Sequence, residues 1–179
     1  MKSLSLILLL SLCILGCQDR TKNATEKLQK KGKVTTYYLI RHAEKKEGND
    51  PELTEKGKAR AQRWAEYFKN DSIDVVYSTD TKRTLATAIP TAEEFGLNVL
   101  KYEPSKVYDD AFKKQTYGKG VLIVGHTTNI PDLANKILGK EKFGDLSMSQ
   151  FGRLYVIKIE DGKAQGAAKT LNNLGNGLH

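Results

Sequence analysis

The stretch VTTYYLIRHAEK, residues 34–45, holds the first strand of the chain and its first chemically reactive side chains. Its first seven residues, 34–40, are mostly β-branched, aromatic or aliphatic, which predicts a buried β-strand. Arg41 and His42 follow that strand directly, so we expect their side chains at its carboxyl end. The rest of the fold can be worked outward from this strand.

A second apolar run, VLIV at 121–124, is followed in the same way by Gly125 and His126. A short, wholly apolar strand is typical of the centre of a parallel sheet that is covered on both faces. Predicted strands and helices alternate along the chain around these two runs. The alternation predicts an α/β fold, a three-layer αβα sandwich with a mostly parallel central sheet.

The remaining elements are predicted from the periodicity of apolar residues. Further strands are expected at 73–77, 97–102 and 154–159, the last of them at an edge of the sheet. Helices are expected at 57–68, 85–95, 105–115 and 130–138. Thr54 is the predicted N-cap of the first helix. Pro90 falls inside the second helix, where we expect a kink or an early end.

The two histidines that follow strands stand in matching places. In an open parallel sheet, ligands bind beyond the carboxyl ends of the strands. His42 and His126 therefore meet in one crevice if their strands are neighbours. Two arginines belong to the same region, because Arg41 precedes the first histidine and Arg83 lies in STDTKRT, 78–84, after another strand.

This set of side chains indicates phosphoryl chemistry. A neutral imidazole is a good nucleophile near pH 7. Two arginines can hold a phosphate dianion and balance the charge on its oxygens during transfer, and a second histidine can donate to the same group. The arginines supply the positive charge, so we expect no metal and no other cofactor. The sequence also has no cluster with metal-ligand spacing.

Four segments resemble the histidine phosphatase superfamily, which has the phosphoglycerate-mutase-like fold: LIRHAEK (39–45), LTEKGKARA (53–61), VYSTDTKRTLATA (76–88) and VGHTTNIP (124–131). The resemblance covers about residues 36–158. It implies that His42 is the nucleophile and forms a phosphohistidine. It also implies that Arg41 and Arg83 bind the phosphate and that His126 completes the pocket and stabilises the transferring group.

The general acid is the open position of this scheme. In the mutase-like branch of the superfamily a glutamate after a middle strand protonates the leaving group, and Glu103 stands at such a strand end. Three other carboxylates are alternatives: Asp109, Asp110 and Glu44. By the same resemblance, Thr127 can offer its hydroxyl or amide to the phosphate, and Thr54 can border the pocket.

The N-terminal segment MKSLSLILLLSLCILGC predicts a targeting sequence. Its apolar part is too short to span a bilayer as a helix, and its end resembles a bacterial lipobox, in which cleavage precedes a lipid-modified cysteine. We therefore expect a signal peptide at 1–16, a lipidated Cys17 with a basic tether at 17–33, and a histidine phosphatase domain at 34–179. An ordinary secretory signal and an uncleaved anchor are the alternatives.

The formal net charge of +8 gives little support for nucleic-acid binding, because of how the charges are distributed along the chain. Residues 18–33 carry six basic and two acidic side chains, whereas residues 34–179 carry 22 and 19. A nucleic-acid site needs a concentrated basic face. Two cysteines are also too few for a disulfide scaffold.

The leading hypothesis is a metal-independent phosphomonoester hydrolase of the acid phosphatase type, held outside the cytoplasm on a bacterial membrane by its lipid. Its partners would be that membrane and a phosphorylated small molecule or protein. The domain leaves little room for an insertion that covers the pocket, which disfavours a mutase. Two alternatives are a protein phosphohistidine phosphatase and a non-catalytic lipoprotein that binds phosphate or another anion.

Overall fold

The computed structural model describes residues 32–171. The predicted signal peptide at 1–16, Cys17 and nearly all of the predicted tether lie outside the described residues, as do residues 172–179. No helix in the described range has both the length and the apolar character that a membrane crossing requires. The anchoring of the chain therefore stays a prediction.

The described chain forms an αβα sandwich of three layers around a six-stranded sheet, which confirms the predicted fold class. The strands are β1 (Thr35–Arg41), β2 (Val75–Ser78), β3 (Val99–Lys101), β4 (Gly120–Gly125), β5 (Arg153–Glu160) and β6 (Lys163–Thr170). The helices are α2 (Glu55–Phe68), α3 (Lys82–Glu94), α4 (Asp110–Thr116) and α5 (Ile130–Leu138). The sheet order is β3-β2-β4-β1-β5-β6.

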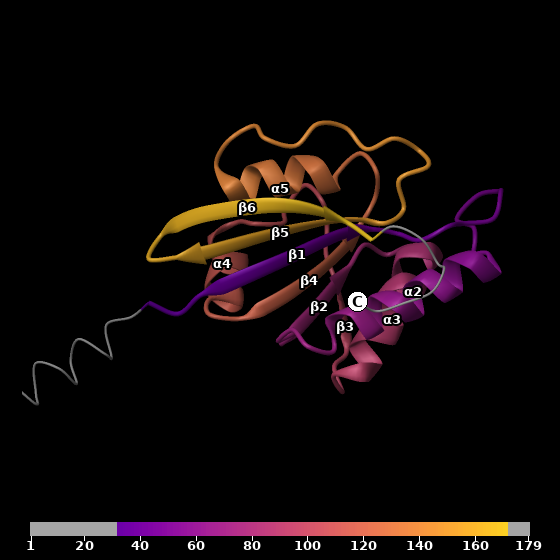
Figure 1. Cartoon of the computed structure of the whole chain (residues 1–179), viewed down its shortest axis with the longest axis horizontal. Coiled ribbons are helices and arrows are strands. Elements are labelled where there is room, and N and C mark those ends of the chain that lie inside the picture. Colours follow the sequence, from indigo (N-terminus) through magenta and orange to yellow (C-terminus); the bar gives the residue numbers. More distant parts are fainter. Residues whose placement is uncertain (1–31, 172–179) are drawn as a thin grey trace, which may run out of the picture. The chain divides into compact units, whose positions relative to one another are not determined.

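Alternation of side chains along β1 builds a hydrophobic core on each face of the sheet. Tyr37 and Leu39 point into the core covered by α4 and α5. Tyr38 and Ile40 point into the opposite core, where α2 contributes Trp64 and α3 contributes small alanines. Figure 1 shows α5 on one side of the sheet and α2 with α3 on the other. Both faces of the central strands are thus buried, as their apolar sequences predict.

The C-terminal part of the sheet differs from the prediction. The strand expected at the edge, β5, lies inside the sheet between β1 and a further strand, β6, and runs antiparallel to both. The sequence of β6, KAQGAAKT, lacks the β-branched and aromatic residues that mark a strand, so its pattern gave no signal. The turn before it did carry one, because Asp161-Gly162, both at positive φ, is a favoured hairpin pair.

Two helix predictions are also corrected. Pro90 lies inside α3, but the helix continues to Glu94, so the expected early end is wrong. Packing of α3 against α2 and β2 outweighs the hydrogen bond that a proline cannot donate. The weak helix expected at 105–115 begins only at Asp110, where Asp109 caps it by accepting from the Phe112 N–H.

Candidate active site

The sheet order brings the predicted histidines together. β4 lies between β1 and β2 and pairs parallel with both, with Arg41 opposite Gly125. Beyond the strand ends the ladder continues, because the His42 N–H donates to the Gly125 carbonyl at 2.9 Å. His126 follows Gly125 at once, and the two imidazole rings lie 5.7 Å apart between centroids. The predicted meeting of both histidines at one sheet edge is therefore what the structure shows.

Gly125 is required by the close packing at this edge. A side chain there would place its Cβ 2.6 Å from the Tyr102 hydroxyl and 2.7 Å from Asn129 Oδ1. The same Asn129 oxygen accepts the His126 N–H at 2.7 Å. This hydrogen bond fixes the turn between His126 and the start of α5. The glycine thus leaves room for the side chains of Tyr102 and Asn129 next to the turn that follows His126.

His42 is held as a neutral imidazole with one defined tautomer. Its Nδ1 lies 2.8 Å from the Ala43 carbonyl, and because a carbonyl only accepts, Nδ1 carries the proton. The pKa of His42 is lowered to about 4, mainly by burial; the positive charges of Arg41 and Arg83 contribute to the lowering, and the backbone hydrogen bond partly opposes it. The lone pair on Nε2 is therefore free near neutral pH, which is the state that a nucleophile needs.

Arg41 is almost fully buried, with 1% of its surface exposed. Its Nη1 donates to the backbone carbonyls of Ser147 and Met148, at 3.2 and 3.1 Å. Its guanidinium carbon lies 4.1 Å from the centre of the Phe151 ring, a cation–π contact. The segment between α5 and β5 thus orients this arginine. Its buried Nε has no hydrogen-bond partner among the described residues, so that N–H is available to an anion.

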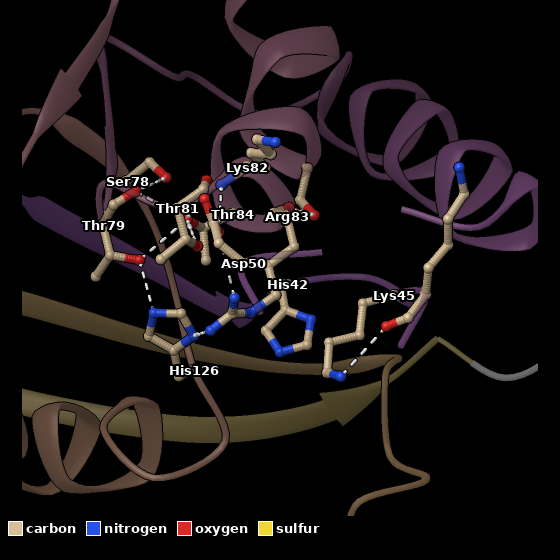
Figure 2. Close-up of polar contacts among 12 residues, drawn as sticks. His42, Lys45, Asp50, Ser78, Thr79, Thr81, Lys82, Arg83, Thr84 and His126 are labelled. Atoms are coloured by element: carbon tan, nitrogen blue, oxygen red, sulfur yellow. Dashed lines mark hydrogen bonds and ion pairs between the residues drawn. The ribbon is translucent and has the colours of Figure 1, made fainter. Parts of the chain in front are cut away.

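Arg83 and His126 form the other half of the site, shown in Figure 2. Arg83 Nη2 donates to His126 Nδ1 at 3.3 Å, which leaves the neutral ring its proton on Nε2. That Nε2 lies 2.9 Å from the Thr79 hydroxyl, which donates onward to Thr84 at 3.0 Å. Burial lowers the pKa of His126, and the nearby Arg83 and Arg41 add to this effect. As in Arg41, the buried Nε of Arg83 has no partner in the described chain.

Sequence reasoning missed three residues of this site: Thr79, Asp50 and Phe151. Thr79 lies next to a predicted strand end, and a closer reading of STDTKRT could have found it. Asp50 lies in the loop before α2, at a φ of 45°, and its carboxylate contacts the start of α3. Phe151 is 6.2 Å from the His42 ring, but no sequence pattern marks it.

The carboxylates considered as general acid lie in different surroundings. Glu44 accepts two hydrogen bonds from Arg60, both at 2.7 Å. Burial raises the pKa of Glu44, but these bonds and the nearby Lys56 more than offset it, so the net shift is downward. A carboxylate kept ionised in this way is a poor proton donor. Asp109 is occupied as the cap of α4, and Asp110 pairs with Lys113 at its exposed start.

Glu103 is exposed and lies just after β3, in a turn closed by its own backbone carbonyl. Its carboxylate makes no hydrogen bond within residues 32–171, so it is free to meet a substrate. Thr127 is half-buried in the turn after His126. Thr54 is the N-cap of α2, as predicted: its hydroxyl accepts from the Gly57 N–H and donates to the Glu44 carbonyl. That hydroxyl is therefore occupied by the cap, and a role for Thr54 at the border of the pocket stays a prediction.

A cavity of about 180 Å³ lies beside this edge of the sheet, between the segment after β3 and the first turns of α5. Its lining includes Tyr102 and Pro104, which flank Glu103, and Asn129, which holds the turn of His126. No group of three or more potential metal ligands occurs among the described residues. The two arginines of the site present N–H donors suited to an oxyanion such as phosphate.

Part of the chain is similar to known proteins. Residues 37–104 match the family model of the histidine phosphatase superfamily, branch 1. Over 72 residues the chain is 40% identical to phosphoserine phosphatase 1 of Hydrogenobacter thermophilus. That alignment covers 35% of this chain and 34% of the relative, so the chain spans about a third of the length of the curated relative that it matches.

Solved structures show the same fold. YhfR of Bacillus stearothermophilus superposes with a TM-score of 0.61 at 17% identity, over 75% of this chain and 96% of the other. A histidine-to-alanine mutant of phosphoserine phosphatase from Entamoeba histolytica, solved with phosphoserine, superposes with a TM-score of 0.56 at 19% identity. That match covers 74% of this chain and 94% of the other.

Proposed function

The chain belongs to the histidine phosphatase superfamily, and from this premise we propose that it hydrolyses phosphomonoesters through a phosphohistidine on His42. The observation that carries the proposal is the hydrogen bond from His42 Nδ1 to the Ala43 carbonyl. It leaves the Nε2 lone pair free in a pocket that also holds two arginines. Two of the similar proteins are phosphoserine phosphatases, which supports a phosphomonoester as the class of substrate.

In the first step, His42 Nε2 attacks phosphorus and the bond from phosphorus to the ester oxygen breaks. Arg41 and Arg83 balance the charge on the equatorial oxygens. A phosphate dianion next to His126 raises the pKa of that imidazole, so Nδ1 takes up a proton and donates to the phosphoryl group. Glu103 protonates the leaving oxygen. In the second step the ionised Glu103 accepts a proton from water, which attacks the phosphohistidine and releases phosphate.

The hydrolase proposal is tested with the full chain and an aryl phosphate in the presence of EDTA. We expect release of phosphate by the wild type and none by His42→Ala. Because the low pKa of His42 keeps its ring neutral in mild acid, activity should persist at pH 5, as in an acid phosphatase. Absence of turnover with every phosphoester over a wide pH range would favour a non-catalytic anion-binding protein. Turnover of phosphohistidine peptides alone would favour the protein phosphohistidine phosphatase.

The role of Glu103 has a separate test. An alkoxide is a poor leaving group and needs a proton, whereas an aryl oxide with a low pKa does not. Glu103→Gln should therefore slow the hydrolysis of alkyl phosphates far more than that of aryl phosphates. Asp110→Asn is a matched control, since Asp110 is an exposed carboxylate that pairs with Lys113. Equal losses on both substrate classes would remove Glu103 from the role.

The lipid anchor on Cys17 is proposed from the sequence of residues 1–17 alone. A diacylated cysteine would hold the domain on a bacterial membrane, outside the cytoplasm. Two acyl chains anchor stably where one does not. Cys17→Ser should release the protein from the membrane fraction. Continued membrane association of the variant would indicate an uncleaved N-terminal anchor instead.

A further inference from the structure

The loop between β1 and α2 carries an acidic side chain into the phosphate site. Asp50, near the end of that loop, accepts the backbone N–H of Lys82, the first residue of α3, through Oδ1 at 3.0 Å. The same oxygen lies 3.5 Å from Nη1 of Arg83. Figure 2 shows Asp50, Arg83 and His126 joined by a continuous series of contacts, with the His42 ring next to them.

These contacts are the ones that an oxygen of a bound phosphate would use. Arg83 presents one amino group to Asp50 and the other to His126, and only its Nε is without a partner in the described chain. These two contacts use only two of the five N–H groups of the guanidinium, but a phosphate oxygen that binds on the Nη1 side would lie against the Asp50 carboxylate. A free N–H at the start of a helix likewise attracts anions. The Asp50 carboxylate thus occupies an anion position at Arg83 and at the start of α3.

The construction of the loop lets this carboxylate leave without disturbing the fold. The base of the loop is fixed by the bridge between Lys45 and Leu53 and by the hydrogen bond from the Lys46 N–H to the Glu52 carbonyl. Residues 45–50 are all exposed. The contacts of Asp50 are therefore what join the far part of the loop to α3.

We propose that Asp50 is an internal competitor of the phosphate group, which a substrate displaces from Arg83 and from the start of α3. This inference rests on the proposed function, because it takes the same site as the phosphate site. A dianion and a carboxylate repel each other and cannot share one N–H. Asp50 therefore sets the affinity of the site for phosphate and favours release of the product.

Asp50→Asn tests the proposal by removing the charge while keeping the size and the acceptor oxygen; asparagine also tolerates the positive φ. The matched control is Glu52→Gln, which removes one negative charge from the same loop, where Glu52 pairs with Lys46 at 3.1 Å. Binding of inorganic phosphate to the full chain is measured by isothermal titration calorimetry. We expect Asp50→Asn to bind phosphate roughly tenfold more tightly and Glu52→Gln to bind as the wild type does.

Three results would overturn the proposal. Weaker phosphate binding by Asp50→Asn would show that Asp50 orients Arg83 for phosphate rather than competing with it. Equal tightening by both variants, or no binding in any of the three proteins, would leave no specific competition at Arg83. Turnover of an aryl phosphate is measured in parallel. Tighter binding by Asp50→Asn without turnover in any protein would sustain this inference and refute the proposed hydrolysis.

Discussion

Each histidine of the site is bonded to a group that fixes the position of its proton. The Ala43 carbonyl can only accept, so it holds the proton of His42 on Nδ1. Arg83 can only donate, so it holds the proton of neutral His126 on Nε2, facing Thr79. The Nε2 lone pair of His42 is thus available for attack on phosphorus, and His126 can take up a proton when an anion binds.

The sequence was informative about some of these residues and silent about others. Arg41, His42 and His126 could be placed because each adjoins a strand whose apolar pattern is clear. Thr79 stands in the segment STDTKRT, after a predicted strand, and could have been found there. Asp50 acts through contacts with residues far away in the chain, and such contacts leave no periodic pattern. The general acid could not be fixed for the same reason, since Glu103 follows β3 in a turn whose path depends on tertiary packing.

Thr79→Val tests how the second imidazole is oriented. Valine keeps the size of threonine but leaves the partly buried Nε2–H of His126 without its acceptor, which costs about 1–3 kcal/mol. We expect kcat to fall about tenfold or more, with Thr79→Ser close to the wild type. Steady-state kinetics of both variants on one aryl phosphate, together with their urea midpoints, make the measurement. Full activity of Thr79→Val would mean that the hydroxyl does not orient His126.

At the scale of elements, an ion pair holds α2 against the loop between β1 and α2, and a glycine allows the close approach. Thr54 caps the helix, and Arg60 on the same helix makes the paired hydrogen bonds to Glu44. Gly57 permits this approach, since a Cβ there would lie 2.0 Å from the Glu44 carbonyl oxygen. The cap was predictable from local sequence, whereas the need for glycine follows only from how closely the loop crosses the helix.

Gly57→Ala should therefore destabilise the domain by about 1–3 kcal/mol, as overpacking of a tight contact does. The backbone of the loop must shift, and that loop begins at the nucleophile, so activity should fall as well. Gly144→Ala is the control, because a Cβ at Gly144 has no atom within 4 Å. Urea unfolding of both variants gives the comparison. Equal stability of the two variants would contradict the close approach.

At the scale of the molecule, the order of the strands creates the site. The sequence predicted the layers and the parallel core of the sheet. It did not predict the strand order, on which the meeting of the two histidines depends, because tertiary packing decides which strands become neighbours. The observed placement of β4 between β1 and β2 allows that meeting. The missed strand β6 lies at the far edge, two strands from β1, so its absence from the prediction did not affect the predicted site.

Burial of the two histidines should make the stability of the whole domain depend on pH. The pKa of His42 is about 4 in the folded state, below its ordinary value of 6.5, so the unfolded chain binds a proton first as the pH falls. The stabilisation is present above pH 6.5 and is lost progressively as the pH falls toward 4. From pH 7 to pH 5, His42 alone should cost about 2 kcal/mol.

Urea unfolding at pH 7 and pH 5 measures this loss. His42→Asn, which cannot titrate in this range, should lose about 2 kcal/mol less than the wild type between the two pH values. Carboxylates with lowered pKa values, such as Glu44, lose their contribution mainly below this window. An equal loss in wild type and variant would show that His42 is not held neutral in the folded protein.

The central claim is that His42 carries the phosphoryl group during turnover. The direct measurement is rapid quenching of the full chain with a labelled aryl phosphate into alkali, where phosphohistidine survives, followed by mapping of the label. The account predicts a label on His42 that forms before phosphate is released, with none in His42→Ala. Phosphate release without any labelled protein, or a label on another residue, would contradict it.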